Sequence, residues 1–220
     1  MVWRAAFLFA VLVALLGVLI ALPAHLFNQL SSWRVWFALA ANFVFFAGAA
    51  WRGATLGKLA KNKDDRQLQS ASGRVAFAVR GAGLLAVYAG AIYEFSRSEP
   101  CLATAIVGVA LALAAIVINR LAISALGKFW DKLVIKDDHR LITDGIYAFV
   151  RHPIYASYIL LFFGYVALFQ APISAAILAI VSAIWFGKRI EIEEKMLIEK
   201  FGDEYRRYCE RSKRLFPFVY

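Results

Sequence analysis

The sequence predicts an all-α protein, a polytopic bundle of transmembrane helices with about six membrane segments. The last two segments are expected to form a short helical hairpin, followed by a cytoplasmic helical tail. Three observations predict this class. Of the 220 residues, 62% are hydrophobic and only 18% are charged; the apolar residues fall into long runs; and the basic residues cluster between alternate runs. A water-soluble domain is usually less than half apolar, so the excess apolar surface is expected to face lipid.

The membrane segments are predicted from six apolar stretches, at about 2–22, 35–51, 75–95, 101–123, 154–169 and 173–187. A helix that crosses the hydrocarbon core needs about 20 apolar residues, and the first four stretches reach or approach that length. The last two are shorter and almost contiguous, which favours a tight hairpin that tilts or thins the bilayer locally. We expect the first stretch to be a retained helix, because no small-residue cleavage pattern of a signal peptide precedes Pro23.

The orientation follows from the basic residues. With the N-terminus in the cytoplasm, 23 of the 25 Lys and Arg residues fall in cytoplasmic segments and only Arg34 and Arg97 fall outside. Cytoplasmic loops of membrane proteins carry this excess. We therefore expect a multi-pass membrane protein with both termini cytoplasmic and membrane lipid as a partner. The same loops account for the net charge of +10, so no nucleic-acid partner is expected.

The chain divides into two predicted regions. Residues 1–125 contain transmembrane helices 1–4 and a basic cytoplasmic loop at 52–74. Residues 126–220 contain a cytoplasmic loop, the hairpin and the C-terminal helices, and are the expected cofactor-binding, catalytic region. A helix is predicted over 188–201, ended by Gly202. A second is predicted from Asp203, as the N-cap, to about Ser212. The run Gly81-Ala82-Gly83 has no preceding strand, which favours close helix packing over a nucleotide-binding loop.

The first group of candidate functional residues lies before the fifth stretch. Asp144-Gly145 is a turn signal, and Pro153 suits the first position of a helix. Arg151 and His152 are therefore expected at a helix entrance, where free backbone N–H groups favour anionic ligand groups. The composition also fits an interfacial belt that only anchors the helix.

The second group lies after the sixth stretch. Arg189 and Glu193 are four residues apart, so they share one helix face close to the membrane. An ordinary surface ion pair has the same spacing, and the spacing alone leaves both interpretations open.

Taken together, these segments resemble the isoprenylcysteine carboxyl methyltransferases and the wider group of membrane methyltransferases that includes phospholipid N-methyltransferases. The resemblance covers roughly residues 126–220, a little under half of the chain. It is carried, in order, by Gly145-Ile146-Tyr147, Arg151-His152-Pro153-Ile154-Tyr155, the hairpin, Arg189 with Glu193-Glu194, Phe201-Gly202-Asp203-Glu204-Tyr205, Tyr208 and Leu215-Phe216-Pro217.

The resemblance implies S-adenosylmethionine as methyl donor, a lipophilic or amphipathic acceptor such as a prenylcysteine-type carboxylate, and no metal. Arg189 would bind the acceptor, and Arg189, Arg151 and Glu194 are the expected catalytic residues. An arginine suits bidentate binding of a carboxylate, whereas an amine or thiol acceptor would need a base such as Glu194. The donor contacts implied are His139, Arg140, Leu141, Ile142, Tyr147, His152, Pro153, Ile154, Tyr155 and Glu193.

Two alternatives stay open. A membrane NADPH-dependent sterol-type reductase shares the Arg-His-Pro-x-Tyr piece, but such reductases usually carry Asn between Pro and Tyr and Gly-Glu after Tyr, where this chain has Ile154, Ala156 and Ser157. A non-catalytic membrane scaffold of the same fold would bind no donor. The sequence also leaves the acceptor open among prenylcysteine, a phospholipid headgroup, a quinone-like lipid and a small thiol.

Overall fold

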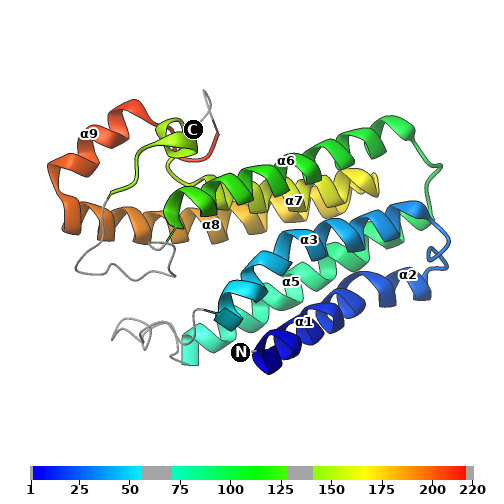
Figure 1. The fold of residues 1–220 in the computed structure, drawn as a ribbon. Helices are drawn as coiled ribbons and strands as arrows, with labels where there is room; N and C mark the ends of the chain where they lie inside the picture. The colour runs from blue at the N-terminus through cyan, green and yellow to red at the C-terminus, as the bar shows by residue number, and fades with distance from the viewer. Residues whose placement is uncertain (1, 56–70, 128–140, 217–220) are drawn as a thin grey trace. The chain divides into compact units, whose positions relative to one another are not determined.

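The regular elements of the protein are helices throughout the residues that the computed structural model describes, 2–55, 71–127 and 141–216 (Figure 1). A single parallel bridge, between Val150 and Lys213, is the exception. The helices are α1 (Val2–Leu16), the π-helix η1 (Gly17–Ala21), α2 (Leu22–Leu26), α3 (Trp33–Thr55), α5 (Ala71–Ser96), α6 (Leu102–Leu126), the 3-10 helix η3 (Gly145–Ala148), α7 (Pro153–Leu168), α8 (Pro172–Phe201) and α9 (Asp203–Arg211). The all-α class predicted from the sequence is confirmed.

The helices form two compact units. The first unit consists of residues 1–113 and 161–179, and the second of residues 114–160 and 180–220. Because the boundaries cut through α6, α7 and α8, each of these helices contributes one part to either unit.

Three of the described helical segments are long and apolar enough to cross a membrane: Trp3–Leu26, Leu102–Leu126 and Pro172–Phe201. Trp33–Gly48 and Pro153–Leu168 are shorter apolar helices. Large apolar side chains point outward from them, with Trp3 89% and Leu102 71% exposed. Contiguous exposed apolar surface of this kind is rare in water-soluble proteins. The chain is therefore an integral membrane protein.

Close helix packing in the first unit depends on glycines of α6 and α7. A Cβ atom added to Gly108 would lie 2.5 Å from the backbone nitrogen of Leu168, and one added to Gly164 would lie 3.0 Å from that of Ala112. Small residues allow such close approach of helix backbones in membranes. The sequence prediction placed this packing at Gly81-Ala82-Gly83, which is wrong for the described residues, because a Cβ on either glycine would meet nothing within 4 Å.

Two charged side chains fix where α7 ends and α8 begins. The buried Arg34 donates from Nη1 to the carbonyl of Leu168, the last residue of α7, and from Nη2 to the carbonyl of Cys101, both at 2.7 Å. Glu94 accepts hydrogen bonds from the backbone N–H groups of Ile173 at 2.9 Å and Ser174 at 2.8 Å. A cation at a helix C-terminus and a carboxylate at an N-terminus each satisfy backbone groups without helical partners.

The longest described helix, α8, joins two segments that the sequence analysis treated separately. The apolar stretch 173–187 and the charged helix 188–201 form one uninterrupted helix of 30 residues. Gly187 lies at their junction, but a single glycine costs a helix only about 1 kcal/mol. The helix ends at Phe201, as predicted, and Gly202 follows with φ +53°.

Candidate functional site

The segment before α7 is shaped by the turn residues that the sequence shows. Gly145 adopts φ +60°, which favours glycine, and η3 follows directly. Pro153 is the first residue of α7, and the carbonyl of His152 accepts the N–H of Ala156 at 3.1 Å. His152 is thus the last residue before the helix, and Arg151 precedes it, as the sequence predicted.

On the other side of the site, α8 turns sharply into α9. The N–H of Gly202 donates to the carbonyl of Ile198 at 2.8 Å, which closes α8 with a residue that has a positive φ. Gly202, rather than Asp203, is the N-cap of α9, so the predicted cap is wrong by one residue. The turn allows α9 to bury Tyr205 and Tyr208.

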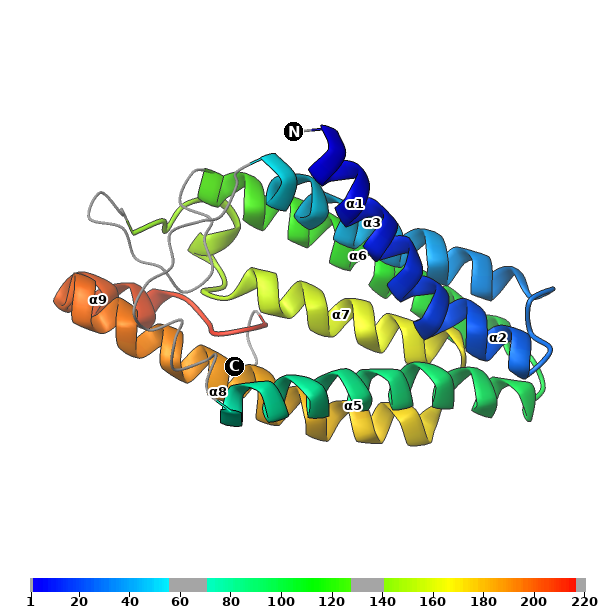
Figure 2. The same cartoon turned by 90° about the horizontal axis from the view of Figure 1, so that it is seen from below.

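Residues 212–214, here called the C-terminal strap, pair with the segment before α7 (Figure 2). Lys213 donates its N–H to the carbonyl of Phe149 at 3.0 Å and accepts the N–H of Arg151 at 2.7 Å. The N–H of His152 donates to the carbonyl of Arg214 at 3.0 Å. The strap therefore satisfies the N–H groups that the sequence analysis expected to be free for an anionic ligand at Arg151 and His152.

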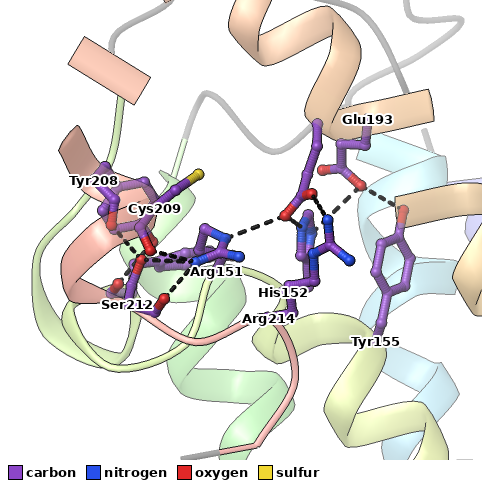
Figure 3. Close-up of polar contacts among 10 residues, drawn as sticks. Arg151, His152, Tyr155, Glu193, Tyr208, Cys209, Ser212 and Arg214 are labelled. Carbon is purple, nitrogen blue, oxygen red and sulfur yellow. Dashed lines mark hydrogen bonds and ion pairs between the residues drawn. The ribbon is translucent and has the colours of Figure 1, made fainter. Parts of the chain in front are cut away.

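An ion cluster surrounds Glu194 (Figure 3). Its Oε1 lies 3.1 Å from Nε of Arg151 and 3.3 Å from Nε2 of His152, and its Oε2 lies 2.8 Å from Nη2 of Arg214. The side chain of Glu194 is only 10% exposed. A carboxylate surrounded in this way is held in its charged form, and both of its oxygens are engaged.

Arg151 connects this cluster to the end of α9. Its Nη1 donates to the carbonyl of Cys209 at 3.0 Å and makes a short hydrogen bond to the carbonyl of Ser212 (Figure 3). Both carbonyls lie in or directly after the last turn of α9, where helical partners are missing. One buried guanidinium thus holds α8, α9 and the strap to the entrance of α7.

Glu193 lies next to Glu194 in the chain but makes a different set of contacts. Its Oε2 accepts the hydroxyl hydrogen of Tyr155 at 2.7 Å, and its side chain is 35% exposed. The Tyr155 hydroxyl in turn accepts a hydrogen bond from Nε of Arg189 at 3.2 Å. The i,i+4 pair that the sequence singled out is therefore joined through a tyrosine of α7.

His152 stands between the two carboxylates. Its Nε2 lies 3.3 Å from Glu194, and its Nδ1 lies 3.8 Å from Oε2 of Glu193. The imidazole stacks on the ring of Tyr155, with centroids 5.7 Å apart and planes at 24°. The residue is 4% exposed, so its buried ring helps to fix the positions of Tyr155 on α7 and of Glu193 and Glu194 on α8.

Buried hydroxyls and a thiol flank the ion cluster. Tyr208 donates to the carbonyl of Tyr147 at 2.7 Å. Burial raises the pKa of Tyr208 to about 12, and it also raises the pKa of the Tyr147 hydroxyl and of the Cys209 thiol. The hydroxyl of Tyr205 is buried without a hydrogen-bond partner among the described residues. These groups stay protonated at neutral pH.

The structure brings together most, but not all, of the residues expected from the sequence. Arg151, His152, Tyr155, Arg189, Glu193 and Glu194 form one connected polar network. Tyr147, Pro153 and Ile154 lie in the elements that hold this network, and Leu141 and Ile142 are half-buried in an irregular segment. His139 and Arg140 lie outside the described residues.

Two members of the site were missed. Arg214 binds Glu194, and Ser212 accepts from Arg151. Arg214 lies 20 residues from Glu194 and Ser212 lies 61 residues from Arg151 in the sequence, and no spacing rule links residues so far apart. The only signal was the neighbouring Leu215-Phe216-Pro217 motif. In the part of the chain that the structure describes, no group of three or more His, Cys, Asp or Glu side chains could hold a metal ion.

The fold and the site define a helical integral membrane protein in which α7, α8 and α9 assemble a charged network. Residues 107–199, less than half of the chain, match the family model of the "Isoprenylcysteine carboxyl methyltransferase (ICMT) family". The resemblance found in the sequence is thereby confirmed.

Individual curated relatives agree with this match. A "Probable protein-S-isoprenylcysteine O-methyltransferase" of Oryza sativa subsp. indica is 31% identical over 116 residues, 51% of this chain and 61% of that protein. A "Methanethiol S-methyltransferase 1" of Bradyrhizobium diazoefficiens is 37% identical over 107 residues, 46% of this chain and 35% of that protein. The chain thus spans less than two thirds of the length of these curated relatives.

A solved structure extends the likeness of the fold beyond the matched segment. It is that of a eukaryotic intramembrane Ras methyltransferase, isoprenylcysteine carboxyl methyltransferase, with a TM-score of 0.58 and 19% sequence identity. The alignment covers 93% of this chain and 74% of that one. At this identity the likeness concerns the fold alone.

Proposed function

We propose that this protein is an integral membrane methyltransferase that transfers a methyl group from S-adenosylmethionine to a lipophilic acceptor, of which a prenylcysteine-type carboxylate is the best candidate. The observation that carries the proposal is that a partly exposed carboxylate, Glu193, and a guanidinium, Arg189, lie on one face of α8 inside the family-matched segment and share the Tyr155 hydroxyl as hydrogen-bond partner. A carboxylate suits the cationic donor, and a guanidinium suits an anionic acceptor.

The donor side is assigned to Glu193 and its surroundings. Oε1 of Glu193 accepts no hydrogen bond from another described residue, and the side chain is 35% exposed, so it fits a ligand that offers an ammonium group or ribose hydroxyls. S-adenosylmethionine, when bound, supplies an electrophilic methyl group on a sulfonium centre. Leu141, Ile142, Tyr147 and the residues from His152 to Tyr155 line the remainder of the proposed donor site, together with His139 and Arg140, which lie outside the described residues.

The acceptor side is assigned to Arg189. Its Nε is bonded to Tyr155, and neither Nη group donates to another described residue. A guanidinium fixed at Nε can offer its Nη groups to a carboxylate with bidentate geometry. A carboxylate acceptor is already ionised, so it needs orientation and proximity to the donor but no general base.

An apolar part of the acceptor also has a place close to Arg189. Phe186 lies three residues before Arg189 on α8, stacks on Trp185 with centroids 5.5 Å apart, and contacts the ring of Tyr155 at 5.7 Å. Tyr158 of α7 lies 6.4 Å from Phe186. We propose that this aromatic cluster contacts the lipid chain of the acceptor where α8 becomes apolar.

Arg151 and Glu194 receive a different role from the catalytic one that the family resemblance implied. Their charged groups are about 10% exposed and bonded to each other, to Arg214 and to backbone carbonyls. Neither oxygen of Glu194 is available to take a proton from an acceptor. We propose that both are positioning residues, which hold α8, α9 and the strap so that Glu193 and Arg189 face the ligands.

The membrane arrangement is part of the proposal. We propose six crossings with both termini in the cytoplasm, in which α7 and the apolar part of α8 form the last hairpin. We also retain the division into residues 1–125 and a cofactor-binding region of residues 126–220. Donor would then reach the site from the cytosol and the acceptor from the inner leaflet.

The test is a methylation assay on purified protein in lipid nanodiscs. S-adenosylmethionine with a labelled methyl group is offered together with N-acetyl-S-farnesyl-L-cysteine, phosphatidylethanolamine or methanethiol, and product is detected as a gain of one methyl group.

We expect transfer to the prenylcysteine carboxylate, and at least a hundredfold lower kcat/KM in Glu193→Gln and Arg189→Lys. Matched controls on exposed residues, Glu191→Gln and Arg206→Lys, should keep the activity of the unaltered protein. Transfer to none of the acceptors would refute the proposal, and transfer only to methanethiol would replace the acceptor class.

The two alternative functions are separated by ligand-induced stabilisation, since a ligand stabilises the folded state that binds it. S-adenosylmethionine and its demethylated product should raise the melting temperature, and NADPH should not. Stabilisation by NADPH alone would favour the sterol-type reductase, and stabilisation by none of the three would favour a scaffold.

A further inference from the structure

The hydroxyl of Tyr155 occupies a position that neither the donor nor the acceptor assignment explains. It lies between the two functional side chains of α8, donating to Glu193 at 2.7 Å and accepting from Arg189 at 3.2 Å. A phenol has a single hydrogen to donate. Because that hydrogen is given to Glu193, the hydroxyl is engaged within the protein, and only the ring of Tyr155 is left to contact a ligand.

We propose that the Tyr155 hydroxyl is a positioning group that couples the donor site to the acceptor site, so that occupation of one raises the affinity of the other. This inference rests on the proposed function, in which Glu193 contacts the donor and Arg189 binds the acceptor. It adds to that function an energetic link between the two sites.

The link follows from the chemistry of the three groups. Hydrogen bonds in a chain polarise one another, so a phenol that donates to a carboxylate is a better acceptor for a guanidinium. A donor molecule that fixes the carboxylate of Glu193 also fixes the direction of the Tyr155 hydroxyl. Nε of Arg189 then has one preferred position, and this position orients the Nη groups of Arg189 toward the acceptor carboxylate. The acceptor no longer loses binding energy in ordering that side chain.

The ring of Tyr155 is held independently of its hydroxyl, which makes the proposal testable. One face stacks on His152 at 5.7 Å, and Phe186 contacts the ring at 5.7 Å from α8. Phenylalanine at position 155 keeps both contacts and removes only the oxygen. The coupling can therefore be abolished without emptying the space between α7 and α8.

The experiment measures binding in both orders in nanodiscs. S-adenosylhomocysteine, the demethylated product, replaces the donor so that no transfer occurs. The acceptor is N-acetyl-S-farnesyl-L-cysteine. If the methylation assay identifies an acceptor of another class, that acceptor is used instead. In the unaltered protein we expect saturating acceptor to lower the Kd for S-adenosylhomocysteine by about fivefold or more, a typical coupling between sites, and the reciprocal effect must be equal.

The coupling ratio is the Kd for S-adenosylhomocysteine without acceptor divided by its Kd with saturating acceptor. In Tyr155→Phe we expect this ratio to fall to about 1, while the Kd for each ligand alone changes by less than about threefold. The control Tyr93→Phe removes the hydroxyl of an exposed tyrosine of α5 that lies far from Tyr155 in the sequence. This variant should keep the full ratio. Arg189→Lys keeps the charge but loses the Nε–H donor, and it should lose the ratio even at an acceptor concentration raised until the variant is saturated. This second variant carries the test if Tyr155→Phe does not fold.

The outcomes separate the inference from the function on which it rests. An unaltered protein that binds both ligands with a ratio of 1, or a Tyr155→Phe protein that keeps the full ratio, would overturn the coupling and leave the methyltransferase intact. An unaltered protein that binds no S-adenosylhomocysteine would refute the proposed function, and the coupling with it.

Discussion

Replacing Arg151 by lysine should loosen α9 and the strap without removing a charge. Lysine keeps a cation near Glu194, but a single ammonium cannot reach both that carboxylate, which Arg151 binds through Nε, and the carbonyls of Cys209 and Ser212, which Arg151 binds through Nη1. Two hydrogen bonds to a charged group are lost, at about 1.5 kcal/mol each. Both side chains of the Arg151–Glu194 pair are 10% exposed, so solvent replaces little of this interaction. We expect α9 to open about 3 kcal/mol more easily, from the same magnitudes.

The half-buried thiol of Cys209 reports this opening directly. Burial raises its pKa, so it reacts slowly with a thiol reagent while α9 is closed. Where opening is fast relative to labelling, the labelling rate follows the population of the open state. A change of about 3 kcal/mol should accelerate labelling by roughly a hundredfold. The assay uses a Cys101→Ser background, because Cys101 is exposed.

A matched control lies on α9 itself. Arg206 pairs with Asp203 at 3.4 Å, and both side chains are more than 60% exposed; such a pair contributes little stability. Arg206→Lys should therefore label within about twofold of the background protein, as expected for a surface pair. Equal labelling rates in Arg151→Lys and the background protein would refute the role given to Arg151, as would an equal acceleration in Arg206→Lys.

Three further changes test the packing and the ends of helices by thermal unfolding in detergent. Gly108→Ala should destabilise by about 1–3 kcal/mol, since its Cβ would meet α7 backbone at 2.5 Å, whereas Gly81→Ala, into open space, should not destabilise; equal effects would show that the close approach is unimportant. Glu94→Ala removes the carboxylate that caps α8 and should cost about 1 kcal/mol, so an unchanged melting temperature would contradict that role. Tyr208→Phe loses the bond to the carbonyl of Tyr147 and should cost about 1 kcal/mol; a cost near zero would mean that solvent replaces this bond.

The sequence predicted most of the helices because the signals for them are local. Long apolar runs identify segments that must avoid water, and Gly145, Pro153 and Gly202 mark turns through their own backbone preferences. The junction of α8 could not be located by the same reasoning. After Gly187 the residues of α8 change from apolar to charged, so this part of the helix suits water rather than lipid. The backbone hydrogen bonds of the helix continue through the junction.

The site was only partly predictable for a related reason. Arg189 and Glu193 are neighbours on one helix, so their spacing reveals them. Glu193 and Glu194 are neighbours in the sequence, and adjacent residues of a helix point about 100° apart. One therefore faces Tyr155, and the other faces Arg151 and Arg214. Which carboxylate is enclosed depends on the strap, and the position of the strap depends on the turn at Gly202.

The pairing of the strap with the segment before α7 also sets an order of events during biosynthesis. Residues 149–152 and Glu194 leave the ribosome before residues 212–214 do, so the ion cluster cannot close while the strap is still being synthesised. The apolar helices can enter the bilayer during that interval, but the Ser212 carbonyl that Arg151 binds has not yet been synthesised. A nascent chain arrested before Ser212 would consequently lack both the Arg214–Glu194 ion pair and the backbone pairing of the strap with residues 149–152.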